Sequence, residues 1–398
     1  MTLGLALESA LACGAGPGTT DRGPGDTGSM GPEDPGHDEE TAPGDPGPEG
    51  TGLPDAEVQG DSGTDNATPP DADASPTSDP GDVAGGDPSS GADDDLTDLA
   101  DAHPEVIEAC PPWSPPQVVG NLDDTDLVEV SGLAASRTHP GILWSHNDSG
   151  DSARIFAIRL PEPPTGDAPP AEAPLTEVMA FPLQGIQVSD VEDIAIGPFA
   201  GIAGDALFLA DTGNNGGRRT ILSVYVFPEP AAIDGSPIED IRRIDLTYPD
   251  GSHDCESLFV DPWTGDLYLV VKEYTLDRTK VFRLAAPAAD TPAIPREPVT
   301  AELVADFPFA TATAADMSPD GLLLAIRGYF DGRLFRRDPG RSVAEMLASD
   351  PCPLPAFMDD LYHEAQGEAL AFDAAGTGFY TASERILFPQ DILYTSVP

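Results

Sequence analysis

Short runs of alternating apolar and polar residues fill the chain from about Gln117 to Pro398. Such alternation is typical of half-buried β-strands. One pattern recurs five times: a polar residue, a small one, alternating apolar residues, a turn, and a second apolar strand that ends in polar groups. The copies begin at Ser131, Glu192, Glu256, Thr313 and Glu368, with starts 61, 64, 57 and 55 residues apart.

A third apolar run follows in every copy, and a fourth is visible in the first three. Four strands in a repeat of this length are typical of a β-propeller blade. The last copy stops after its third strand, and the segment 116–121, ahead of the first copy, supplies the missing one. Pairing this N-terminal strand into the final blade closes the ring and removes an exposed edge.

We therefore predict an all-β fold, a β-propeller of five four-stranded blades closed by an N-terminal strand. Six blades is the alternative, if the loop-like stretches 161–180 or 340–362 hide further strands. Helices play little part, and the clearest candidate is a short one near Ser342–Ala348. The propeller domain spans 110–398, which is long enough for one large domain with a sizeable core.

Residues 14–109 have a different composition. They contain no Phe, Tyr or Trp, and they hold 25 Asp and Glu residues against one basic residue, Arg22. Such a segment cannot bury enough apolar surface to offset its ordering entropy, so we predict a disordered, extended tether. The whole chain carries a net charge of −51, which excludes binding to nucleic acid phosphates, opposes contact with anionic membranes and favours a soluble monomer.

The first 13 residues are small and mostly apolar, and they end in Cys13. They resemble the end of a bacterial lipoprotein signal, in which small residues precede a lipidated Cys. There is no basic region and Glu8 interrupts the apolar run, so a clipped start is one explanation. We predict export to the bacterial cell envelope or beyond, with a lipid anchor at Cys13 as the protein's membrane contact. The alternative is a soluble N-terminus with a stray Cys.

Three further cysteines allow at most one intramolecular bridge. Cys110 and Cys352 both lie in Pro-rich loops, whereas Cys255 lies between two acidic residues at the head of a predicted inner strand. We predict a Cys110–Cys352 disulfide and a free Cys255. Three free thiols is the alternative, which exported compartments disfavour.

The repeat geometry predicts where polar side chains meet. In a propeller the first strand of each blade lines the channel and the second runs antiparallel to it, so the start of the first and the end of the second open on one face. One set of polar residues there is the leading acids Glu192, Glu256 and Glu368. A second set closes the second strands: His146, Asn147, Asp148, Asp211, Asn214, Lys272 and Arg327.

These residue types suggest two kinds of binding. Clustered Glu, Asp and Asn oxygens suit a hard cation such as calcium. Lys272, Arg327 and His146 are candidates to hold an anionic group. The alternative is structural: Glu, Lys and Arg pairs tie the blades together, and the segments 146–150 and 211–215 are good turn sequences.

Five motifs carry a family resemblance: His-Asn-Asp-Ser-Gly at 146–150, Val-Glu-Asp-Ile-Ala at 191–195, Asp-Thr-Gly-Asn-Asn at 211–215, Tyr-Pro-Asp-Gly at 248–251 followed by Glu-Ser-Leu, and Gly-Glu-Ala-Leu at 367–370. The set resembles a family of exported bacterial propeller proteins, often lipoproteins. More distantly, the layout is similar to calcium-dependent propeller hydrolases of the phytase-like and lactonase groups, through a shared inventory of Glu, Asn and Asp at one channel mouth.

Three functions remain open at this point. The first is a surface-anchored binding propeller that takes a cation or a small anionic ligand at its channel mouth. The second is a metal-assisted hydrolase of phosphate or carboxylic esters. The third is a protein-interaction scaffold with a merely structural channel.

Overall fold

The computed structural model describes residues 110, 113–161, 175–273, 278–287, 297–329, 331–354, 364, 366–385 and 390–396. The predicted signal, the lipidation site Cys13 and the predicted tether lie outside these residues. None of the described helices is long and apolar enough to cross a membrane.

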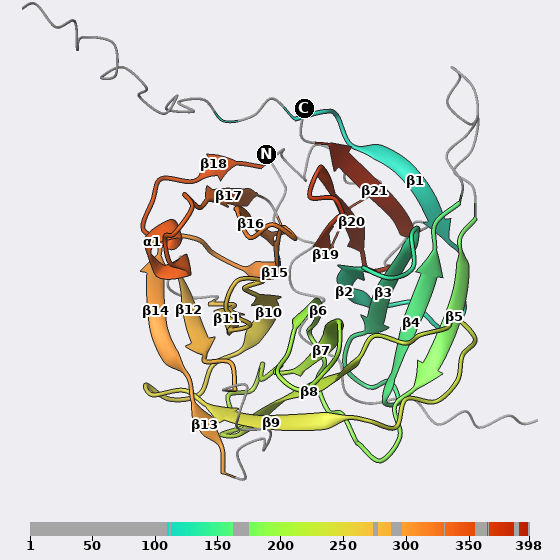
Figure 1. Ribbon diagram of the computed structural model, residues 1–398, viewed down its shortest axis with the longest axis horizontal. Helices are drawn as coiled ribbons and strands as arrows, with labels where there is room; N and C mark the ends of the chain where they lie inside the picture. The colour runs from blue at the N-terminus through green and yellow to red at the C-terminus, as the bar shows by residue number, and fades with distance from the viewer. Residues whose placement is uncertain are drawn as a thin grey trace, which may run out of the picture. The chain divides into compact units, whose positions relative to one another are not determined.

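Five antiparallel sheets follow one another around a common axis (Figure 1). The innermost strands of blades 1 to 5 are β2 (Val130–Ala135), β6 (Asp193–Pro198), β10 (Cys255–Val260), β15 (Ala312–Met317) and β19 (Gly367–Phe372). The second strands are β3 (Ile142–Asn147), β7 (Asp205–Asp211), β11 (Leu267–Val271), β16 (Leu323–Gly328) and β20 (Gly378–Ser383).

The third strands are β4 (Arg154–Arg159), β8 (Leu222–Pro228), β12 (Thr279–Leu284), β17 (Gly332–Arg336) and β21 (Gln390–Ser396). The fourth are β5 (Glu177–Pro182), β9 (Arg242–Thr247), β14 (Glu302–Phe307), β18 (Cys352–Pro353) and β1 (Gln117–Leu122). Blade 2 gains a short fifth strand, β13 (Val299–Thr300), which pairs in parallel with β9.

The predicted five-bladed propeller is confirmed. Strand β1 pairs antiparallel with β21, so the N-terminal strand completes blade 5 and closes the ring. The described part of the stretch 340–362, residues 340–354, contributes the short outer strand of blade 4 rather than a sixth blade. It also contains α1 (Val343–Leu347), where the predicted helix begins with a capping box between Ser342 and Glu345.

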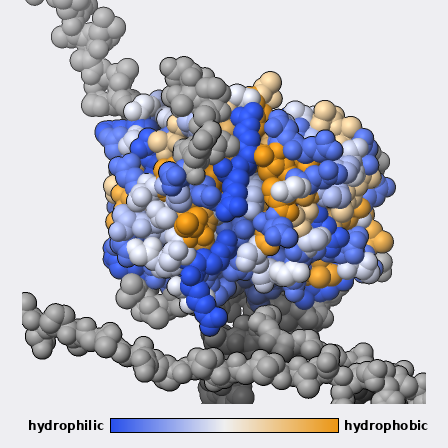
Figure 2. Space-filling view, turned by 90° about the horizontal axis from the view of Figure 1, so that it is seen from below, coloured by the Kyte–Doolittle hydropathy of each residue, from blue (hydrophilic) through white to orange (hydrophobic). Residues whose placement is uncertain are grey.

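Five hydrophobic clusters pack adjacent blades together, one at each blade–blade interface. The cluster between blades 1 and 2 includes Trp144, whose ring meets that of Phe181 edge-on at 5.4 Å. Apolar side chains on both faces of each sheet explain this arrangement, because each blade must bury both faces against its neighbours. Figure 2 shows one side of the ring, where hydrophilic residues form a band between smaller hydrophobic patches.

The first described residues, ahead of β1, contact the last two blades of the ring. Cys110 forms a disulfide with Cys352 of β18, with Cα atoms 5.4 Å apart, while Cys255 is free and buried. Trp113 donates from Nε1 to the carbonyl of Pro353 at 3.3 Å and packs edge-on against Phe379 of blade 5. The segment ahead of β1 therefore contacts both blades 4 and 5.

Candidate functional site at the mouth of the ring

The leading polar residues of the repeats lie at irregularities in the innermost strands. Four of these strands shift register, at Ser131, Glu256, Thr313 and Glu368. In blade 2, Glu192 immediately precedes β6, and its amide donates to the carbonyl of Ala210. A β-bulge re-aims a side chain that a regular strand would direct elsewhere, and bulges are enriched beside functional sites.

The two hydroxyl-bearing leaders join neighbouring blades. Ser131 donates to the carbonyl of Glu192 at 3.1 Å, and Thr313 donates to the carbonyl of Gly367 at 3.0 Å. They hold blade 1 to blade 2 and blade 4 to blade 5, so the acidic leaders are left as the candidates for ligand binding.

Seven carboxylates gather where the first strands begin and the second strands end. They form three groups in which the ligand atoms lie within 4.8 Å of one another. The groups are Asp148, Asp190 and Glu192; Asp148, Glu368 and Glu384; and Glu192, Asp254 and Glu256. Because Asp148 and Glu192 each belong to two groups, the seven side chains form one connected cluster, which we call the acidic mouth.

Burial and mutual repulsion raise the pKa values in the acidic mouth. Desolvation raises the pKa of Asp148 to about 7, with Glu368 adding to the effect. Desolvation also raises the pKa of Glu192 well above its usual range, helped by Glu256 and Asp148. The pKa of Glu384 rises to about 10 through burial and the nearby Glu368. Near neutral pH, the mouth therefore retains protons unless a cation replaces them.

A polar network connects the acidic mouth across three blades. The ammonium group of Lys272 lies 2.9 Å from Oε2 of Glu256 and donates to the hydroxyl of Tyr329 at 3.1 Å. That hydroxyl donates to Oε1 of Glu368 at 2.7 Å. Burial raises the pKa of Glu256, and the ion pair with Lys272 opposes this rise. Lys272 is therefore committed to the protein's own carboxylates.

Arg327 is fully buried and has the acidic partner that its place in an apolar strand requires. Its Nη1 atom lies 2.8 Å from Oε1 of Glu364, and neither side chain is more than 3% exposed. Its guanidinium packs against the bare backbone of Gly367. Arg327 is thus a structural cation in the interior of the propeller.

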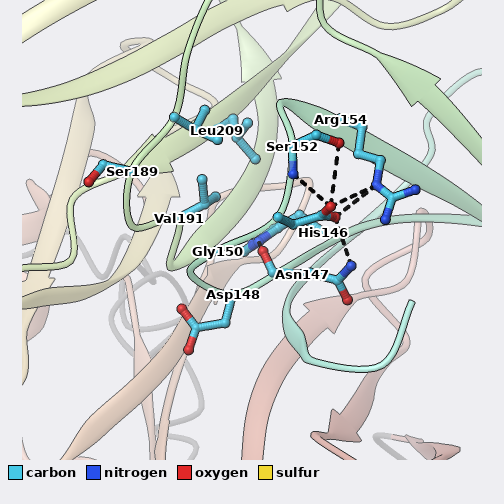
Figure 3. Close-up of a pocket in the computed structure, with 11 residues that line it drawn as sticks. His146, Asn147, Asp148, Gly150, Ser152, Arg154, Ser189, Val191 and Leu209 are labelled. Atoms are coloured by element: carbon cyan, nitrogen blue, oxygen red, sulfur yellow. Dashed lines mark hydrogen bonds and ion pairs between the residues drawn. The ribbon is translucent and has the colours of Figure 1, made fainter. Parts of the chain in front are cut away.

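His146 is buried beside the mouth and uncharged. Its Nδ1 atom lies 2.8 Å from the carbonyl of Asn147, and burial lowers its pKa to about 4. Among the described residues, its Nε2 atom has no hydrogen-bond partner. A small hollow lined by His146, Asp148, Ser189, Val191 and Leu209 lies next to it. In Figure 3 the Asp148 carboxylate points away from the cluster formed by Asn147, Ser152 and Arg154.

The remaining candidates hold loops in place. Asn147 accepts from the amides of Val128 and Glu129 at 3.0 Å. Asp211 pairs with Arg219 at 2.8 Å and accepts from the amide of Asp190 at 3.0 Å.

Asn214 bonds the backbone of Arg219 in both directions, through its amide nitrogen and its oxygen. Such contacts fix the loops that carry the acidic mouth, which corresponds to the turn-forming alternative for these residues.

Sequence reasoning missed several acids. Asp190 precedes its strand by three residues, so the repeat pattern did not include it. Asp193 and Asp316 lie within innermost strands, and each accepts from the amide of the next blade's inner strand, Leu258 or Phe372, at 2.7 Å. The sequence signal that could have identified these two contacts between blades is an acidic residue inside an otherwise apolar inner strand.

No protein-family model and no curated protein matches the chain. Solved structures similar to it include a nidogen/laminin complex, at 13% identity and a TM-score of 0.36, covering 64% of this chain and 72% of that one. The Dos1 propeller has 11% identity and a TM-score of 0.29, covering 67% and 68%. Hydrazine synthase from Kuenenia stuttgartiensis has 12% identity and a TM-score of 0.35, covering 69% and 98%. These distant likenesses concern the fold alone. By its own strand pairing, the chain is a five-bladed β-propeller with an acidic mouth.

Proposed function

We propose that the protein is a binding propeller whose acidic mouth takes up a hard divalent cation, calcium being the type that suits it. The observation that carries this proposal is the connected cluster of seven carboxylates, three of which (Glu192, Glu256 and Glu368) are at most 4% exposed. Lys272 offsets the charge of Glu256, but burying the other carboxylates as anions is costly, and a divalent ion would remove that cost. Calcium prefers carboxylate oxygens, which are the ligands available here.

The three side chains that were candidates to bind an anion are either paired with carboxylates of the protein or uncharged. The mouth therefore suits a cation better than a small anion. Lys272 pairs with Glu256, and Arg327 pairs with Glu364 in the interior. His146 is uncharged near neutral pH because burial lowers its pKa to about 4. An anion entering the mouth would meet mainly carboxylates, so it would need a bound metal ion to attract it.

We further propose that the propeller works outside the cell, attached through Cys13 and held away from the membrane by the acidic segment 14–109. This part of the proposal rests on the sequence, where the lipoprotein-like start and the tether follow each other directly. Such an arrangement needs no nucleic acid or protein partner, and the propeller would act as a monomer.

A second candidate function is metal-assisted ester hydrolysis. The pKa of Asp148, raised to about 7, suits a general base at neutral pH. A cation in the same mouth could activate water. Turnover of phosphate and carboxylic ester substrates that a chelator abolishes would favour this function, whereas no turnover across such a panel favours binding alone.

The direct test is thermal unfolding of the full chain with millimolar calcium and with a chelator. A free calcium concentration one hundred times the dissociation constant would stabilise the folded state by about 2.7 kcal/mol. The midpoint temperature of unfolding would rise accordingly. The double variant Glu192→Gln/Glu256→Gln should lose this response. The acidic segment 14–109 is common to both proteins, so its weak calcium binding cancels in the comparison. An unchanged midpoint for the natural chain would overturn the proposal.

A further inference from the structure

The three carboxylate groups of the acidic mouth differ in how well the protein itself compensates their charge. Glu368 accepts from Tyr329 and Gln366, and Gln366 also donates to Glu384. Glu256 is paired with Lys272, and Asp254 accepts from the amide of Asn214 through Oδ1, while its Oδ2 has no hydrogen-bond partner among the described residues. In two of the three groups, side chains of the protein therefore stabilise carboxylates.

The group formed by Asp148, Asp190 and Glu192 lacks this support. Asp148 accepts from the amide of Ser149. In the part of the chain that the structure describes, no donor lies on the carboxylates of Asp190 or Glu192. Glu192 is 3% exposed, so it is a buried acid without a hydrogen-bond partner among these residues. For a buried carboxylate in this state, a water molecule or an ion is a suitable partner from outside the chain.

Gly213 keeps space open for these carboxylates. A Cβ atom at this position would collide with Oε1 of Glu192 and would lie 2.5 Å from Oδ2 of Asp190. Both side chains thus rest against bare backbone, which only glycine offers. Its φ angle is not in the left-handed region, so backbone conformation does not explain the glycine.

Three hydrogen bonds hold the loop around Gly213. Arg219 donates from Nη1 to the carbonyl of Gly213 at 2.8 Å and from Nη2 to the carbonyl of Asp211 at 2.9 Å. The amide of Gly213 donates to the carbonyl of Asp190 at 3.1 Å. Supporting contacts of this kind fix the position of ligating groups before a ligand arrives.

We propose that Asp148, Asp190 and Glu192 hold one hard divalent cation at the interface between blades 1 and 2, with Gly213 as its floor. This inference rests on the proposed function and assigns it to one of the three groups. Three carboxylates supply three to six of the roughly six to eight oxygens that calcium takes. Water or a ligand in the mouth supplies the others.

The test measures calcium binding to the full chain by isothermal titration calorimetry. Gly213→Ala should weaken binding by about tenfold or more, the range seen when ligand-supporting groups are removed. Gly216→Ala is the matched control, because its Cβ would meet Arg218 no closer than 3.6 Å. It should bind as the natural chain does.

Two isosteric variants keep the test decisive if Gly213→Ala folds poorly. Asp190→Asn should weaken calcium binding by a similar factor, whereas Glu384→Gln, in the mouth but outside this group, should change it by less than about threefold. Binding that survives Asp190→Asn and is lost in Glu384→Gln would overturn the location and leave the proposed function standing. No calcium binding by the natural chain beyond that of the segment 14–109 would overturn both.

Discussion

Lys272 and Glu256 form an ion pair with a separation of 2.9 Å, in which each side chain is 5% exposed. Glu256 comes from the bulge in β10, and Lys272 directly follows β11, its antiparallel partner. The pair therefore brings the start of the first strand and the end of the second together in one blade. Tyr329 extends the contact to blade 4.

Replacing Lys272 should destabilise the propeller. In Lys272→Met, Glu256 stays buried without its cation, and breaking a buried pair in this way costs about 3–5 kcal/mol. The pKa of Glu256, already raised by burial, should rise further. A carboxyl group whose pKa is raised in the folded state stabilises that state at low pH. This stabilisation is lost as the pH rises through the folded-state pKa. Because the pKa of Glu256 is about 8 in the natural chain and higher in the variant, the loss measured by urea unfolding should be larger at pH 9.5 than at pH 7.

The double variant Lys272→Met/Glu256→Gln is the control for this prediction. It removes both charges and should recover most of the lost unfolding free energy, because no uncompensated charge is left. A double variant as unstable as Lys272→Met would show that packing around Lys272, rather than charge, is what matters.

The Cys110–Cys352 disulfide should be a major source of stability. It joins residues separated by 242 positions and ties the segment ahead of β1 to blade 4. Removing a native disulfide typically costs about 2–5 kcal/mol. We expect Cys110→Ser/Cys352→Ser to unfold at a correspondingly lower urea concentration. Dithiothreitol should destabilise the natural chain and leave this variant unchanged, since Cys255 is unpaired. A variant as stable as the natural chain would contradict the prediction.

The repeats made most of the fold predictable. Inner strands such as β2 are buried on both faces and appear as short apolar runs bounded by turn residues, whereas outer strands such as β5 and β9 alternate between more buried and more exposed positions. Either signal is strong over six residues. Both fail for β18, which has two residues, Cys352 and Pro353. That outer strand forms through pairing with β17 and has no pattern of its own.

The candidate site was predictable to the level of its leading residues. Equivalent places in a repeat lie at one end of a ring, which locates Glu192, Glu256 and Glu368 together. The role of Gly213 depends on how closely the carboxylates of Asp190 and Glu192 approach its loop. The spacing of residues along the sequence gives no information about such a distance. The partner of Arg327 was unpredictable for a similar reason, because Glu364 lies in the connection between blades 4 and 5.

Gly367 should tolerate no side chain. A Cβ at this position would collide with Nη2 of Arg327 and would lie 2.5 Å from its Cζ. Arg327 is fully buried, so it cannot move aside into solvent. Overpacking of this kind typically costs about 1–3 kcal/mol, and displacing the Glu364 pair adds to it. Gly367→Ala should therefore lower the urea midpoint, whereas Gly216→Ala should not. Equal midpoints for the two variants would refute this account.

Asp316 should give the propeller a stability that depends on pH. Burial raises its pKa to about 6 from an ordinary 3.8, against the opposing effects of Arg137 and the amides of Phe372 and Met317. The folded state then holds a proton that the unfolded chain has released. The resulting stabilisation is fully present below about pH 4 and is lost as pH rises through 6. The two pKa values correspond to about 3 kcal/mol across this range.

The comparison with Asp316→Asn isolates this contribution, because the carboxylates of the acidic mouth are common to both proteins. The variant cannot titrate at this position, and its amide cannot accept from Phe372 through the nitrogen. We expect the unfolding free energy of the natural chain, minus that of the variant, to decrease by about 2 kcal/mol between pH 4.5 and pH 7.5. Urea unfolding at several pH values would measure it. A difference that stays constant or increases with pH would show that Asp316 is ionised throughout, held in its charged form by the two backbone amides.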